Sequence, residues 1–153
     1  MKQLKQSKQL GSRGVRSLVL CLGLGFGVAL SAAAQTTDVV VIVHKDNLNQ
    51  IDAAYVAQIY TGVLKGWPDG TPVFTLDQME DAPARKLFYT QIVGKSAAAM
   101  KAIWSQNIFA GKGLPPKIAS PDAEMKRLVA TNRNAIGYVL ASQVDASVRV
   151  IGK

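Results

Sequence analysis

The N-terminal segment limits which part of this chain can form a folded domain. Five basic residues and no acidic residue precede residue 17, and residues 18–30 (LVLCLGLGFGVAL) form an apolar run that ends before Ser-Ala-Ala-Ala. This order is typical of a secretory signal peptide. The run is shorter than the ~20 residues that a membrane-spanning helix needs, although an uncleaved N-terminal anchor remains an alternative. We therefore expect residues 1–34 to be a cleaved signal peptide and residues 35–153 to be an exported domain.

Much of the positive charge, and the only cysteine, lie in this leader. The chain has 18 basic and 10 acidic residues, and the leader holds five of the basic residues and none of the acidic ones. The scattered charges of the remainder are poor support for nucleic-acid binding. Cys21 lies in the apolar run, so cysteine chemistry and disulfides are excluded for the exported domain. Lipidation of Cys21 is an alternative, although Leu20 before it is larger than such a site normally carries.

Apolar residues repeat at two spacings along the domain, which predicts strands and helices. Residues 38–44 (DVVVIVH) are typical of a strand that is buried on both faces, and further strands are expected at residues 71–76, 135–140 and 147–151. Four helices are expected after the capping residues Asp52, Asp81, Ser96 and Ser120. The order strand, helix, strand, three helices, two strands indicates an α/β fold, in which about four helices cover a small parallel or mixed sheet.

Local signals refine these elements. The first helix has apolar residues at helical spacing, and its inward positions are Val56, Ile59, Tyr60 and Val63. Pro83 fits the first turn of the second helix, and Gly94 fits its end. Residues 109–117 are rich in glycine and proline and are expected to lack regular structure. Trp67 stands in a Gly-Trp-Pro-Asp-Gly turn, where we expect it to pack over the loop, with exposure in a groove as the alternative.

The domain contains no residue set that is typical of an enzyme site. His44 is the only histidine, and it has no second His or Cys with which to share a metal. No serine lies in a G-x-S-x-G elbow, and no nucleotide-binding glycine loop is present. Asp77, Glu80 and Asp81 form an acidic cluster, which we interpret as a loop acid and a helix cap. We therefore expect a protein that is not an enzyme and that has no cofactor and no metal site.

The starts of the helices are the more promising sites. Asp81, Ser96 and Ser120 each precede an expected helix, and the free N–H groups and dipole of a helix N-terminus favour an anion. Gln78 and Arg85 lie near the junction of the second strand and the following helix, which is where ligands bind in many α/β sheets. This placement indicates a small-anion site.

Several motifs occur in a recognisable order. An apolar strand leads into a helix that closes on Ile-Tyr-Thr-Gly, then come Trp-Pro-Asp-Gly, Arg-Lys-Leu-Phe-Tyr, Gly-Lys-Gly-Leu-Pro-Pro and Ala-Ile-Gly-Tyr. Together they resemble the phosphate-binding-protein-like domain family, which includes the substrate-binding proteins of phosphate ABC transporters. The resemblance implies one lobe of a type II periplasmic-binding-protein fold, a periplasmic location, a phosphate-type anion as ligand and the membrane component of an ABC transporter as partner.

The phosphate loop of this chain departs from the family's pattern. The family typically carries an Arg and then Ser-Gly-Thr, whereas Gln78 and the Ala-Pro-Ala of residues 82–84 stand at those positions here. The change removes a guanidinium, two hydroxyls and one backbone N–H, all of which strengthen phosphate recognition. The loop is therefore interpreted as degenerate, and the candidate ligand-binding residues are Gln78, Ala84, Arg85 and Lys112.

A second hypothesis follows from the length of the domain, which is about that of one lobe. Two-lobed phosphate-binding proteins trap the anion between their lobes, and a lone lobe would expose the face that meets its partner. The alternative is therefore a non-enzymatic protein-interaction module that has lost its ligand. A homodimer or another exported protein would cover that face, with residues 111–117 and Trp67 as the expected contacts.

Overall fold

The computed structural model describes residues 38–152. The expected signal peptide, its cleavage site and Cys21 lie outside these residues. Within the described part of the chain, no helix combines the length and the apolar character needed to cross a membrane.

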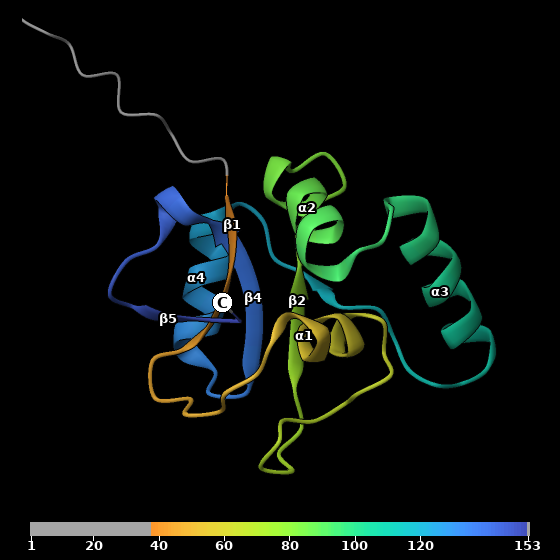
Figure 1. Cartoon of the computed structure of the whole chain (residues 1–153), viewed down its shortest axis with the longest axis horizontal. Helices are drawn as coiled ribbons and strands as arrows, with labels where there is room; N and C mark the ends of the chain where they lie inside the picture. The colour runs from red at the N-terminus through yellow and green to blue at the C-terminus, as the bar shows by residue number, and fades with distance from the viewer. Residues whose placement is uncertain (1–37, 153) are drawn as a thin grey trace, which may run out of the picture. The chain divides into compact units, whose positions relative to one another are not determined.

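Residues 38–152 form strands and α-helices that are interspersed along the chain (Figure 1). The strands are β1 (Val39–His44), β2 (Phe74–Asp77), β3 (Lys117–Ile118), β4 (Ala135–Leu140) and β5 (Val148–Ile151). The helices are α1 (Ala53–Tyr60), α2 (Pro83–Phe88), α3 (Ala97–Phe109) and α4 (Asp122–Thr131). A π-helical turn (Tyr89–Val93) extends α2, and a 3-10 turn (Ala141–Gln143) follows β4. The expected α/β order is confirmed, and the two-residue β3 is an addition to it.

The strands form one mixed sheet in the order β3-β2-β4-β1-β5. β2 runs parallel to β3 and to β4, whereas β1 runs antiparallel to β4 and to β5. In β1, Val41 lies opposite Tyr138 of β4 on one side and opposite Ile151 of β5 on the other. The parallel strands β2, β3 and β4 therefore end at the same edge of the sheet.

Helices cover both faces of the sheet and create two hydrophobic clusters. Val41 and Val43 of β1 pack in the cluster that contains Tyr60 and Phe88, whereas Ile42 packs in the cluster that contains Met125. Successive side chains of a strand point to opposite faces, so a strand that is apolar at nearly every position can be buried on both. The expectation for the first strand is thus confirmed.

Helix α4 approaches β4 closely at Gly137. A Cβ at this position would lie 2.4 Å from Sδ of Met125 and 3.2 Å from Cγ2 of Val129. The absence of a side chain therefore lets the helix pack onto the strand, and it explains why a glycine interrupts an otherwise apolar strand.

Helix α1 begins as the sequence predicts and ends before Val63. The carboxylate of Asp52 accepts a hydrogen bond from the N–H of Tyr55 at 2.8 Å, and Thr61 forms the C-cap. The three expected core residues within the helix are buried. Val63 was also expected inside, but this expectation is wrong: the side chain is 69% exposed because it lies beyond the end of the helix.

Two helix starts differ from the expectation. Ala82, and not Asp81, is the N-cap residue of α2. Helix α4 begins at Asp122 directly after Pro121, so Ser120 does not cap it. Neither cap residue supplies a side-chain hydrogen bond, and in α4 the acid in the first turn interacts favourably with the helix dipole instead.

Other local expectations are confirmed. Pro83 occupies the first position of α2, and Gly94, with φ of 66°, ends the π-helical turn. Ser96 caps α3 by accepting a hydrogen bond from the N–H of Ala99 at 3.1 Å. Trp67 is only 3% exposed, so it packs over the loop and does not line a groove.

Candidate functional site

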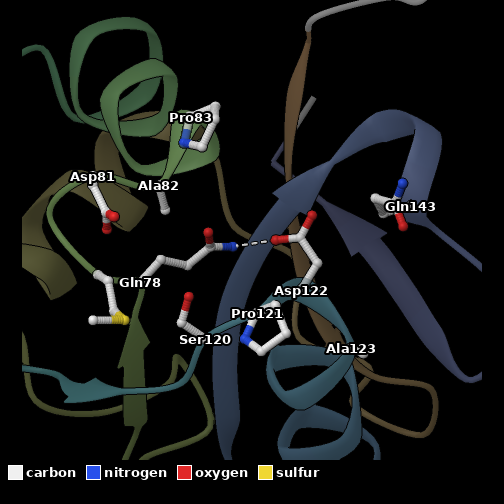
Figure 2. A pocket seen from close by; sticks show the side chains of 10 residues that line it. Gln78, Asp81, Ala82, Pro83, Ser120, Pro121, Asp122, Ala123 and Gln143 are labelled. Carbon is white, nitrogen blue, oxygen red and sulfur yellow. Dashed lines mark hydrogen bonds between the residues drawn. The ribbon is translucent and has the colours of Figure 1, made fainter.

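A hollow lies where the three parallel strands end (Figure 2). We call it the edge cleft. Its volume is about 550 Å³, and it is lined by residues that follow β2, β3 and β4. These are Gln78, Met79, Asp81, Ala82, Pro83, Ser120, Pro121, Asp122, Ala123 and Gln143. Ligands of α/β proteins bind outside the carboxyl ends of parallel strands, because the chain turns there from strand to helix.

Gln78 is the most fixed polar group of the edge cleft. Its side chain is nearly inaccessible, and its amide Nε2 donates to Oδ1 of Asp122 at 2.6 Å and to the carbonyl of Tyr138 at 3.1 Å. Its backbone N–H donates to Oδ1 of Asp77 at 2.8 Å. Figure 2 shows the amide reaching across the cleft toward the start of α4.

Asp122 places a carboxylate where the dipole of α4 favours negative charge. It accepts a hydrogen bond from the amide of Gln78. Its carboxylate thus occupies part of the position that an anion at this helix start would take. Asp81 is a second acid in the lining, and no Lys or Arg is part of it. The cleft therefore combines two helix starts with two acids, which favours a ligand that can donate hydrogen bonds as well as accept them.

A buried carboxylate lies directly beneath this cleft. Asp77 is 4% exposed at the end of β2. Its Oδ1 accepts hydrogen bonds from the backbone of Gln78 and from the hydroxyl of Tyr138. Its Oδ2 accepts from the hydroxyl of Tyr89 at 2.5 Å and from Nε of Arg85 at 3.2 Å. Four donors surround one acceptor-only group, which suits an ionised carboxylate.

The partners of Asp77 have perturbed pKa values. Burial, and then the negative charge of Asp77, raise the pKa of Tyr89 and that of Tyr138 far above the ordinary value. Burial is the largest influence on Arg85 and lowers its pKa, but the charge of Asp77, its hydrogen bond and the two tyrosines together outweigh burial, so the net pKa is raised. Both tyrosines thus stay neutral donors and Arg85 stays a cation across the physiological range.

The four predicted ligand-binding residues do not share one hollow. Gln78 lines the edge cleft, whereas Ala84 is buried in the core at 2% exposure. Arg85 lines another cavity between α2 and α3. Lys112 is exposed in the loop after α3, where its carbonyl accepts a hydrogen bond from Nζ of Lys65. Gln78 and Arg85 meet through their shared contacts with Asp77, and their role in ligand binding stays a prediction.

The structure brings two of the three proposed helix starts together. Asp81 and Ser120 both line the edge cleft, but Ser96 lies at another hollow. Sequence reasoning did not name Asp122 or Gln143 as site residues. Gln143 could have been found by applying the strand-end rule to the predicted strand at β4, whereas Asp122 follows β3, a strand that the sequence did not predict.

Metal-ligating side chains do not gather in the part of the chain that the structure describes. Residues 38–152 contain no group of three or more His, Cys, Asp or Glu that could hold a metal ion. His44 uses its Nδ1 to accept a hydrogen bond from the N–H of Asp46 at 3.1 Å.

Solved structures with the same fold are substrate-binding proteins. A protein from Clostridium perfringens, described as a phosphate ABC transporter substrate-binding protein with bound phosphate, matches with a TM-score of 0.61 at 26% identity over 74% of this chain. An ABC-type phosphate transport receptor from Vibrio cholerae matches with a TM-score of 0.58 at 18% identity over 74% of this chain. PstS from Borrelia burgdorferi matches with a TM-score of 0.57 at 9% identity over 75%.

The match is to part of each of those proteins. This chain covers 44%, 45% and 46% of the three structures, respectively. The sequence matches no protein-family model and no curated protein. The expected fold is confirmed: the described residues have the α/β fold of part of a type II periplasmic binding protein, and the domain is phosphate-binding-protein-like.

Proposed function

We propose that the chain is an exported, non-enzymatic substrate-binding module that holds a small phosphate-type anion in the edge cleft for ABC transport. The observation that carries this proposal is the convergence of three parallel strand ends and two helix starts on one cleft. The similarity to transport proteins, one of which was solved with bound phosphate, supports the ligand class. A periplasmic location and a transporter partner are part of the proposal.

The contacts of the edge cleft suggest which anion it would take. Backbone N–H groups at the start of α2 would donate to the anion, while Asp122 and Asp81 would accept and Gln78, whose amide is bound to Asp122, would hold that carboxylate in place. A carboxylate can accept a hydrogen bond from an oxyanion only if that anion carries a proton. Hydrogen phosphate carries one at neutral pH, whereas sulfate does not. We expect phosphate to bind more tightly than sulfate.

Thermal unfolding of the purified protein in phosphate and in sulfate tests this function. A ligand that binds the folded state raises the melting temperature by mass action. We expect a saturable rise with phosphate, a smaller one with sulfate, and loss of the difference in Asp122→Asn. Glu124→Gln, also in the first turn of α4 but outside the cleft lining, is the matched control. No shift with either anion would overturn the proposal.

A second function has one specific observation in its favour. Large apolar side chains are exposed at the end of α3 and in the loop that follows it, where Phe109 is 96% and Leu114 is 80% exposed. These residues support the protein-interaction alternative, with residues 111–117 as a contact but without Trp67, which is buried. Light scattering over a range of concentrations, with Leu114→Asp as the variant, tests for a homodimer. A monomer at every concentration would count against that homodimer.

A further inference from the structure

A second cavity gathers sequence elements that the proposed function does not use. It measures about 300 Å³ and lies between α2, α3 and the segment that leads into β3. We call it the side cavity. Asp77, Arg85 with Tyr89, and the Pro115-Pro116 pair come from three separate motifs of the sequence, and all of them line it.

The polar end of the side cavity is formed by Arg85. Its Nε pairs with Asp77, and its guanidinium lies over the ring of Tyr89 at 5.0 Å from the ring centroid. The two terminal nitrogens donate no hydrogen bond to any residue of the range 38–152. They are open to solvent, and the side chain as a whole is 13% exposed. They are therefore accessible donors on a side chain whose plane is fixed, which suits a carboxylate.

The charged groups around these donors are of both signs. The lining of the side cavity has two cations, Arg85 and Lys101, and two acids, Asp77 and Glu80. Asp77 is buried and already accepts four hydrogen bonds, whereas Glu80 is exposed. Lys86 and Lys95 line a neighbouring hollow that Arg85 and Glu80 also border, so three lysines lie on the two hollows that Arg85 borders.

The remaining wall is apolar, and part of it is open to water. Apart from Ser105, it consists of Met100, Trp104, Ile108, Pro115, Pro116 and Ile118. Ile108 is 50% exposed and Ile118 is 54% exposed, so a ligand that lay on them would remove apolar surface from water. A cavity with a few placed polar groups and an apolar wall is typical of a site for a small organic molecule.

We propose that the side cavity is a second ligand site, for a small amphipathic carboxylate with an aromatic or branched apolar body. The carboxylate pairs with the terminal nitrogens of Arg85, and the body lies between α3 and the proline pair. This site is distinct from the edge cleft, because the two linings share no residue.

The tryptophan fluorescence of the purified protein provides the test. Trp104 lines the side cavity, whereas Trp67 is buried elsewhere. We expect saturable quenching by 1-naphthoate, and about tenfold weaker binding of the uncharged 1-naphthamide, because the charge-assisted hydrogen bonds are lost. Saturating phosphate leaves naphthoate binding unchanged if the sites are separate. Equal binding of acid and amide, or no binding of either, would overturn the proposal.

Two variants locate the site. Arg85→Gln weakens naphthoate binding by about tenfold. That change also removes a partner of the buried Asp77, so a second variant is needed. Ile108→Glu serves this purpose, because Ile108 is half exposed and its apolar side chain makes no hydrogen bond to Asp77. Ile108→Glu weakens binding by a similar factor, whereas Phe109→Glu, one residue further and outside the lining, leaves it unchanged. If the affinity for naphthoate does not differ between Phe109→Glu and the other two variants, the assignment is refuted.

Discussion

Asp77 shows how a single buried acid organises its neighbours. Its carboxylate accepts hydrogen bonds from four groups, which come from the residue after β2, from α2, from the π-helical turn and from β4. Those bonds hold Gln78 on one side and Arg85 on the other, so both cavities depend on the same acid. Loss of one donor would leave a buried acceptor partly unsatisfied, which costs more than the net value of an ordinary hydrogen bond.

Tyr138→Phe tests this dependence. The variant removes one donor to Asp77 and one acceptor of the Gln78 N–H. We expect the free energy of unfolding to fall by about 1–3 kcal/mol in urea titrations. Tyr55→Phe is the matched control, because its hydroxyl makes one bond, to the carbonyl of Gly66 in a partly buried place, and we expect it to lose about 1 kcal/mol or less. Equal losses of unfolding free energy in the two variants would show that the bond to Asp77 contributes no more than an ordinary hydrogen bond.

The same network predicts a loss of stability in alkali. Burial and the charge of Asp77 raise the pKa of Tyr89 and that of Tyr138, so the folded protein holds these protons more tightly than the unfolded chain does. The stabilisation is fully present below the unfolded pKa, about 10, and is lost as the pH rises from there toward the raised folded values. Urea titrations at pH 8 to 11 measure it. We expect a shallower decline in Tyr138→Phe, and a decline as steep as in the parent protein would argue against this cause.

At the scale of elements, some helices begin with a side-chain cap and others without one. The carboxylate of Asp52 accepts a hydrogen bond from the N–H of Tyr55 in the first turn of α1, whereas Ser120 precedes α4 without capping it. We expect Asp52→Ala to lower the free energy of unfolding by about 1 kcal/mol. Ser120→Ala should change it by less than about 0.5 kcal/mol. A loss in Ser120→Ala as large as in Asp52→Ala, measured by thermal or urea unfolding, would contradict the structure.

These elements also show what can be read from sequence. The strand at β1 and the caps at Asp52 and Ser96 were predictable, because their signals are local: a β-branched run, and an acceptor just before an apolar repeat. The two-residue β3 and the true start of α4 were not, because pairing with β2 and packing on β4 decide them. The spacing of apolar residues likewise does not predict that β1 runs antiparallel to β4.

The site was predictable to a similar degree. Gln78 was named, and its place in the edge cleft follows from the strand-end rule. Arg85 was named with it because the two are close in sequence, but a helix turn directs them to different cavities. Asp122 was not named as a site residue, since its meeting with Gln78 joins segments 44 residues apart. Such a contact depends on the order of strands in the sheet.

For the molecule as a whole, the sheet predicts a gradient of local stability. β4 and β1 each pair with strands on both sides, whereas β3 is a short edge strand and α3 buries completely only Met100. We expect the amides of β1 and β4 to exchange with deuterium most slowly, and those of α3 and β3 to exchange much faster. Exchange in α3 as slow as in β1 would contradict this order, and added phosphate should slow exchange around the edge cleft if the proposed ligand binds there.

The place of β1 between β4 and β5 also affects how the chain can fold during its synthesis. β1 is the first of the described strands to be synthesised, but the residues that pair with Val41, Tyr138 and Ile151, follow it by roughly a hundred residues. Contacts between residues so distant in sequence form slowly, because a long loop must close first. The described sheet therefore cannot be completed until β5 has been synthesised. Until then β1 lacks both of its strand partners, and its apolar side chains are open to contact with other molecules.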